Sequence, residues 1–196
     1  TGNLFSDQDV QAIIEAAPGL VVLDEAYTAF TQYDSQKWLV EHRHVVIMRT
    51  VSKMGLAGLR LGFCFAHPAI TNELEKVRLP YNINCLTQHT AEFILKHADI
   101  LEAQTQALRK LRSQLNDQLS LFSCFEVFPS EANFLLVRVL PNELSAREIF
   151  TALKERGVLI KCLDGGHPLL AQCLRFTVGS EEENQALISA LKDIYR

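Results

Sequence analysis

Residues 44–66 read HVVIMRTVSKMGLAGLRLGFCFA, two short apolar runs on either side of a loop that contains glycines. The runs at 44–50 and 59–66 are continuous rather than alternating in polarity, a pattern typical of strands buried on both faces of a sheet. A third such run, residues 20–23, follows a helical pattern over residues 7–17. Strands that alternate with helical segments predict an α/β fold with a mixed or parallel sheet.

Downstream of this stretch the pattern becomes helical from about Thr87 to Leu121, with a break at residues 97–99. Strand and helix patterns alternate after it, which predicts a small α+β domain. The expected strands of this domain are 125–128, 133–139, 158–162 and 173–178, and the expected helices are 145–156 and one beginning after Ser180. The predicted organisation is therefore part of a larger domain (1–95), a long connecting helix (96–122) and a small domain (123–196).

Composition narrows the classes of protein. The chain has 196 residues, 48% of them apolar, and a formal net charge of −4. So apolar a chain is not disordered, and its acidic balance argues against nucleic acid as a partner. No stretch of 18 residues is apolar throughout, so no membrane segment is expected. The five cysteines form no C-x-x-C pair, which favours a reducing compartment, the cytoplasm, and argues against a metal site.

Polar side chains follow the first and second buried strands. Asp24 and Tyr27 come after residues 20–23, and Ser52 and Lys53 come after residues 44–50. Ligands in open α/β sheets bind at the carboxyl ends of strands. Hydroxyls, a glycine-rich turn and Arg60 together favour an anion site, most naturally for phosphate. The alternatives remain open that Asp24 only caps a helix and that Lys53 is an ordinary exposed lysine.

Arg175 lies inside an otherwise apolar strand, where an unpaired charge is costly. It either forms a structural ion pair or presents a planar fork to a substrate carboxylate. Taken together, an acid, a phenol, a phosphate cradle and a lysine are the groups that pyridoxal phosphate chemistry requires. The basic cluster Arg109, Lys110 and Arg112 is interpreted as the solvated face of the long helix.

The same motifs resemble the fold-type I pyridoxal-phosphate-dependent aminotransferases, class I/II. The resemblance covers the whole chain, and the Pro80–Asn84 segment is most similar to the histidinol-phosphate aminotransferase branch. The motifs that carry it are Thr1-Gly2-Asn3, Val22-Leu23-Asp24-Glu25-Ala26-Tyr27, Arg49-Thr50-Val51-Ser52-Lys53, Leu56-Ala57-Gly58-Leu59-Arg60-Leu61-Gly62, Ala132-Asn133-Phe134 and Leu174-Arg175-Phe176-Thr177-Val178-Gly179.

The resemblance implies a role for each matching residue. Lys53 is the implied catalytic residue, which holds the aldehyde of pyridoxal 5'-phosphate and moves a proton. Asp24 pairs with the pyridinium nitrogen, Tyr27 binds the phenolic oxygen, and Ser52 and Arg60 bind the phosphate. The implied substrate-binding residues are Arg175, which takes a carboxylate, together with Asn133 and Lys161. Lys161 stands where the family often has an arginine, and the spacing from Lys53 to Arg60 is one residue shorter than in many members.

The implied fold is the large-domain portion of a fold-type I transferase, with a small α+β domain. The implied reaction exchanges an amino group between glutamate and imidazole-acetol phosphate in histidine biosynthesis, in a homodimer acting on small molecules. The chain opens without Met, so we expect a C-terminal portion that lacks the family's N-terminal half and has little activity alone. Two alternatives stay open: a pyridoxal-phosphate decarboxylase of a phosphorylated amino acid, and a non-catalytic α/β module that binds a phosphate-bearing ligand.

Overall fold

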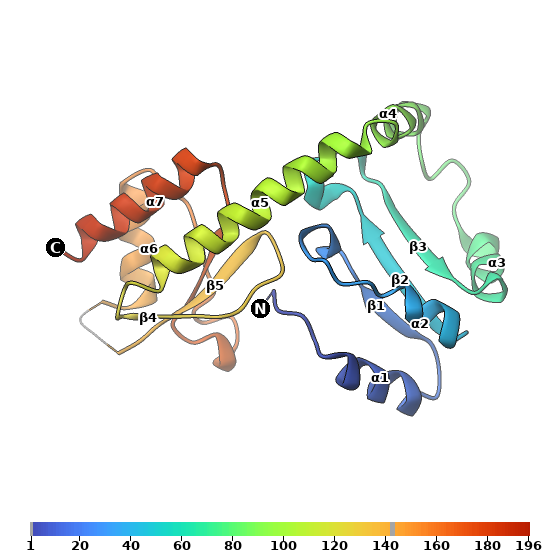
Figure 1. Cartoon of the computed structure of the whole chain (residues 1–196), viewed down its shortest axis with the longest axis horizontal. Coiled ribbons are helices and arrows are strands. Elements are labelled where there is room, and N and C mark those ends of the chain that lie inside the picture. Colours follow the sequence, from blue (N-terminus) through green and yellow to red (C-terminus); the bar gives the residue numbers. More distant parts are fainter. Residues whose placement is uncertain (1, 142–143) are drawn as a thin grey trace. The chain divides into compact units, whose positions relative to one another are not determined.

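The computed structural model describes residues 2–141 and 144–196, so Thr1 of the first motif lies outside the described residues. The chain divides into two compact units (Figure 1). Phe5–Thr105 form the unit that carries Lys53, called the Lys53 unit below. Thr1–Leu4 with Gln106–Arg196 form the unit that carries Arg175, called the Arg175 unit.

The Lys53 unit contains a three-stranded sheet of order β1-β2-β3. β1 and β2 are parallel, and β3 runs antiparallel to β2, which confirms a mixed sheet in an α/β fold. Short 3-10 turns lie at Thr28–Phe30, Ser52–Met54 and Ala57–Leu59. The longer elements are α1 (Asp7–Ala16), β1 (Val21–Asp24), α2 (Gln36–Glu41), β2 (Val45–Thr50), β3 (Gly62–Ala66), α3 (Pro68–Val77), α4 (Cys85–Leu95) and the first turns of α5 (Ala98–Leu119).

One face of this sheet packs against α1 and α2. Ile14 and Trp38 from these helices join Ile47 of β2 in a buried cluster. On the opposite face Val22 is 51% exposed and Met48 is 41% exposed. In the described part of the chain, the prediction of strands buried on both faces is therefore wrong for β1 and β3. In β2, by contrast, Val45, Val46 and Ile47 are buried in succession, so both faces of the strand are buried there. The strands are apolar on both faces, but the described helices α1 and α2 cover only one of them.

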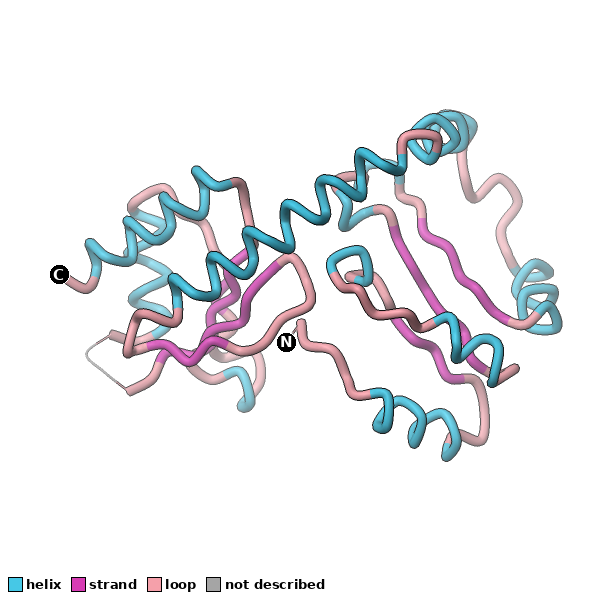
Figure 2. Tube along the Cα trace, in the orientation of Figure 1, coloured by secondary structure: helices cyan, strands magenta, loops and turns pink. Residues whose placement is uncertain are grey.

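The Arg175 unit contains a four-stranded antiparallel sheet of order β4-β5-β7-β6. Figure 2 shows helices beside this sheet, and side chains from these helices enter its core, among them Leu115, Leu153 and Leu191. The core therefore occupies one face of the sheet. The elements are the rest of α5, β4 (Phe125–Val127), β5 (Phe134–Val139), α6 (Ala146–Glu155), β6 (Lys161–Cys162), a 3-10 turn at Pro168–Leu170, β7 (Cys173–Thr177) and α7 (Glu181–Ile194).

Helix boundaries follow local signals. Ser145 begins α6 and Ser180 begins α7, each in a capping box with the glutamate three residues later. Gly157 has φ of +79° just after α6, a backbone conformation that favours glycine and ends the helix. The strand expected at 158–162 is shorter than predicted, because the Val158 N–H still bonds to the Leu153 carbonyl, so regular pairing begins only at Lys161.

The helical stretch is divided where the pattern breaks, since α4 ends at Leu95 and α5 begins at Ala98. The boundary between the two compact units falls inside α5, between Thr105 and Gln106. The finer scheme, with a separate connecting helix at 96–122, stays a prediction. Among the described residues, no helix combines the length and apolar character that a membrane crossing requires.

Candidate functional site

The five residues expected to bind a cofactor gather at one edge of the sheet in the Lys53 unit. Asp24 is the last residue of β1, and Ser52 and Lys53 follow the end of β2. Because β3 is antiparallel, its beginning lies at this same edge, and Arg60 comes two residues before it. The topology therefore brings together side chains from positions 24 to 60, at the place where open sheets bind ligands.

Lys53 and Tyr27 lie together at this edge. The Lys53 ammonium is 5.1 Å from the centre of the Tyr27 ring, within the range of a cation–π contact. Tyr27 is held by a turn in which its carbonyl accepts from the Phe30 N–H at 3.0 Å. Lys53 is exposed, whereas Tyr27 is half-buried. In the described part of this edge, Lys53 thus presents an accessible primary amine beside the phenol of Tyr27.

Asp24 does not begin a helix, because the next helical turn starts at Thr28 and has Tyr27 before it. Its Oδ1 accepts a hydrogen bond from the Ala26 N–H at 3.1 Å, which orients the carboxylate just beyond the strand. The same carboxylate lines a pocket of 330 Å³ over the sheet, together with Thr50 and Gly62. A Cβ at Gly62 would lie 3.1 Å from the Arg49 carbonyl oxygen, so a side chain at this position would crowd the backbone of the neighbouring strand β2.

A network of hydroxyls shapes the loop that carries Lys53. Thr50 Oγ1 accepts from the Ser52 N–H at 3.0 Å and lies 3.0 Å from Ser52 Oγ. It also lies 3.1 Å from the Leu61 carbonyl, which joins the two ends of the loop. Gly55, with φ of +84°, and Arg60, with φ of +51°, supply the left-handed turns that the loop needs. No role is predicted for Thr50 from the sequence, although its place at the end of β2, two residues before Ser52, was the available signal.

In the Arg175 unit, the three expected substrate-binding residues lie on or beside its sheet. Arg175 and Lys161 are partners across the β6–β7 pair, so their side chains point to the same face. Two cations placed side by side favour an anion between or above them. Asn133 comes just before β5, and its carbonyl accepts from the Val178 N–H at 2.9 Å.

Arg175 lies against an aromatic ring rather than against an acid. Its guanidinium carbon is 5.1 Å from the centre of the Phe134 ring. Its Nε is buried, and no described residue offers it an acceptor within hydrogen-bond distance. A buried donor left without a partner costs free energy, and the described fold does not offset this cost with an acceptor.

Arg112 corrects one expectation. It is not on a solvated face, because its side chain is only 11% exposed and forms an ion pair with Glu131 at 2.8 Å. Its other terminal nitrogen donates to the Ala132 carbonyl at 3.0 Å. Helical spacing of basic residues alone did not reveal this partner, since Glu131 lies 19 residues further along the chain.

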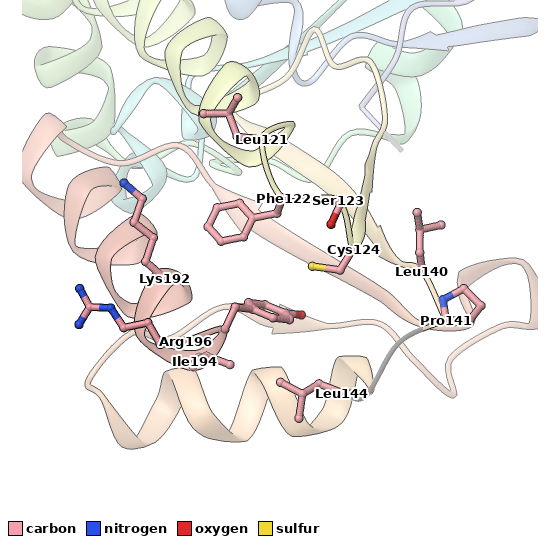
Figure 3. A pocket seen from close by; sticks show the side chains of 11 residues that line it. Leu121, Phe122, Ser123, Cys124, Leu140, Pro141, Leu144, Lys192, Ile194 and Arg196 are labelled. Carbon is pink, nitrogen blue, oxygen red and sulfur yellow. The ribbon is translucent and has the colours of Figure 1, made fainter.

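A larger hollow lies elsewhere in the Arg175 unit (Figure 3). It measures 740 Å³ and is walled by residues from the ends of α5, β5 and α7, among them Phe122, Leu140 and Tyr195. None of the eight expected site residues lines it. The larger of the two pockets is therefore not the one at which the expected site residues lie.

Comparisons with known proteins give a matching family model and relatives that are all named as aminotransferases. The family model for aminotransferase class I and II matches residues 1–191. The chain is 53% identical over 192 residues to histidinol-phosphate aminotransferase 2 of Nitrosococcus oceani, covering 98% of this chain and 53% of that protein. It thus spans about half the length of the curated relatives it matches.

Two solved structures share the fold. Histidinol-phosphate aminotransferase from Sinorhizobium meliloti, in complex with pyridoxal-5'-phosphate, superposes with a TM-score of 0.85 at 27% identity, covering 99% of this chain and 54% of that one. The enzyme of the same name from Clostridium acetobutylicum gives 0.90 at 22% identity, covering 99% of this chain and 60% of that one. The second likeness shows the fold alone.

Proposed function

The chain belongs to the class I and II aminotransferase family, and from that premise we propose that its sheet edge holds pyridoxal 5'-phosphate. The reaction proposed is amino transfer between glutamate and imidazole-acetol phosphate, the histidinol-phosphate aminotransferase reaction. The names of the relatives at about 50% identity support this choice. The observation that carries it is the gathering of Asp24, Tyr27, Ser52, Lys53 and Arg60 at one sheet edge.

The residues at this edge fit the cofactor by their chemistry. Pyridoxal phosphate, when bound, supplies an aldehyde and a ring that withdraws electrons. Ser52 and Arg60 provide a hydroxyl and a guanidinium for its phosphate. Asp24, oriented by the Ala26 N–H, provides a carboxylate for its ring nitrogen. The Tyr27 hydroxyl is the donor for its phenolic oxygen.

Lys53 is the proposed catalytic residue. Its ammonium lies at the Tyr27 ring and is exposed, so a substrate can reach it. As a free amine, Lys53 Nζ would take a proton from the α-carbon of the amino donor and, in the second half-reaction, would deliver a proton to the α-carbon of the amino product. Asp24 would hold the cofactor's ring nitrogen, since a neighbouring carboxylate favours the protonated form of that nitrogen.

The proposed substrate contacts are Arg175, Lys161 and Asn133. Arg175 would bind a carboxylate with its planar fork, and Lys161 would add a second positive charge on the same face. This chain spans about half of its relatives' length, so we propose that it has little transaminase activity by itself.

A borohydride experiment tests the cofactor site. After incubation with pyridoxal phosphate and reduction, peptide mass spectrometry is expected to find the phosphopyridoxyl group on Lys53. The Lys53→Ala variant is expected to lose this label, because no other amine lies at the site edge among the residues named above. Lys96→Ala, which removes an exposed lysine of α4's end, serves as the matched control and should keep it. Labels spread evenly over surface lysines would favour a module without a cofactor site.

The same proposal includes the oligomeric state and the cellular location of the protein. We propose a homodimer, supported by exposed apolar side chains of the Lys53 unit such as Leu79, Tyr81 and Leu86. Sedimentation equilibrium measures the molar mass that tests it. We also propose a cytoplasmic location, supported by five cysteines that all remain thiols.

A further inference from the structure

The loop before β5, residues 129–133, is held from both sides. Arg112 of α5 donates to Glu131 Oε2 at 2.8 Å and to the Ala132 carbonyl at 3.0 Å. On the other side, the Glu131 N–H donates to the Gly2 carbonyl at 2.7 Å. Ser130 closes the loop, since its hydroxyl donates to the Phe134 carbonyl at 2.6 Å.

This anchored loop determines where the Phe134 ring lies. A Cβ on Gly2 would come within 3.0 Å of Phe134 Cε2 and 2.9 Å of Ser130 Oγ, so residue 2 packs tightly against that ring. Gly2 also has φ of +87°, which other residues rarely adopt. The ring thus packs against the N-terminal segment, and its position depends on the loop that precedes β5.

The other neighbour of the Phe134 ring is Arg175. The guanidinium carbon lies 5.1 Å from the ring centre, and no described residue accepts from the buried Nε. The described hydrogen bonds therefore do not aim this side chain. A cation–π contact favours a guanidinium position over the aromatic face, which limits the directions in which its paired N–H groups can point.

We propose that Arg112 is a positioning residue: it fixes the 129–133 loop and, through the Phe134 ring, the direction of the Arg175 guanidinium. The inference rests on the proposed role of Arg175 in binding a substrate carboxylate. A purely structural ion pair would change the stability of the unit but leave the carboxylate-binding group where it is. If Arg112 is a positioning residue, in contrast, its replacement changes the affinity for the ligand although Arg112 does not contact the ligand.

Two measurements on the 196-residue chain test the coupling. The first is the chemical shift of the Arg175 Nε–H group in NMR spectra. The nearby Phe134 ring changes this chemical shift, so the Phe134→Leu variant identifies the signal. The second is the Kd for glutarate, a dicarboxylate probe that resembles glutamate without its amino group. Arg112→Gln is expected to move the signal toward that of an exposed arginine and to weaken glutarate binding about tenfold, since a misdirected fork loses part of its paired contact.

Matched variants separate positioning from stability. Lys110→Gln removes an exposed cation two residues away on the same helix and should change neither reading. Arg112→Lys keeps one donor for Glu131 and should recover part of the affinity. If Arg112→Gln fails to fold, Glu131→Gln replaces it, because it breaks the ion pair but keeps the bond to the Ala132 carbonyl.

The outcomes are distinct. The inference is overturned if Arg112→Gln lowers the melting temperature but leaves the Arg175 signal unmoved and the Kd for glutarate within about twofold of the value for the unmodified chain. An unmodified chain that does not bind glutarate overturns the proposed role of Arg175 instead. In that case the movement of the Arg175 signal still decides whether Arg112 positions the guanidinium.

Discussion

The carboxylate of Asp7 joins the start of α1 to the segment that enters α2. Its Oδ1 accepts from the Tyr33 hydroxyl at 2.6 Å, and Oδ2 pairs with the Lys37 ammonium. The Trp38 indole N–H donates to the same Tyr33 oxygen at 2.9 Å. The bond from Lys37, followed by that from Tyr33, lowers the pKa of Asp7 below its ordinary value.

The lowered pKa predicts a pH-dependent stability. In the unfolded chain the pKa of an aspartate is about 3.9, so a lower folded value means that folding favours the charged form. The stabilisation is complete above the unfolded pKa and is lost as pH falls through the folded pKa. Asp7→Asn is therefore expected to lower the melting temperature at pH 7 and to lose this difference in acid.

Thermal unfolding measured from pH 7 down to about pH 2 checks this behaviour. Asp117→Asn, at an exposed position of α5, removes the same charge and controls for the change in net charge. An Asp7→Asn difference that stays constant across the whole range would contradict the assignment.

At the scale of elements, α6 and α7 owe their beginnings to capping boxes. In α6 the Ser145 hydroxyl accepts from the Glu148 N–H, and Glu148 Oε2 accepts from the Ser145 N–H at 2.7 Å. The bonds from Ser145 lower the pKa of Glu148. α6 packs Ile149 and Leu153 into the core, so its first turn supports the main cluster of the Arg175 unit.

Ser145→Ala is expected to lower the free energy of unfolding of the chain by about 1 kcal/mol, the usual cost of losing an N-cap. Urea unfolding followed by circular dichroism measures it. Thr151→Ala changes a hydroxyl in the exposed middle of the same helix and should alter stability by less than about 0.5 kcal/mol. Equal effects at both positions would show that the cap is not what stabilises the helix.

Element boundaries were predictable where the signals are local. The break between α4 and α5, the start of α7 and the end of α6 all follow from caps, glycine and helical spacing. No helix is predicted at residues 68–77, where α3 forms behind His67, whose ring accepts from the Ala69 N–H at 3.2 Å. Pro68 at the first helical position was the available signal.

At the scale of the whole molecule, the two units have unequal cores. The described cluster of the Lys53 unit contains Ile14, Val21, Trp38, Val45 and Ile47. The cluster of the Arg175 unit joins β4, β5, β7 and three helices. Burial of apolar surface is the main stabilising contribution to folding, so the second unit is expected to open less often.

Hydrogen exchange measures this difference. In the isolated 196-residue chain, amides of β5 and β7 are expected to exchange at least about tenfold more slowly than those of β1–β3. Equal protection of the two sheets would show that the chain unfolds as one cooperative unit. Added pyridoxal phosphate should slow exchange in β1–β3 selectively if it binds at their edge.

The sequence by itself determined an α/β fold with a mixed or parallel sheet, several helix ends, and which residue types follow the ends of the strands. Strand runs, caps and the spacing of Ser52, Lys53 and Arg60 are local signals, read within a few residues of one another. The tertiary structure decided the rest: which sheet face is covered, that Phe134 meets Arg175, and that Arg112 holds a loop rather than facing water. Those contacts join residues far apart along the chain, and only the packed fold brings their side chains within reach.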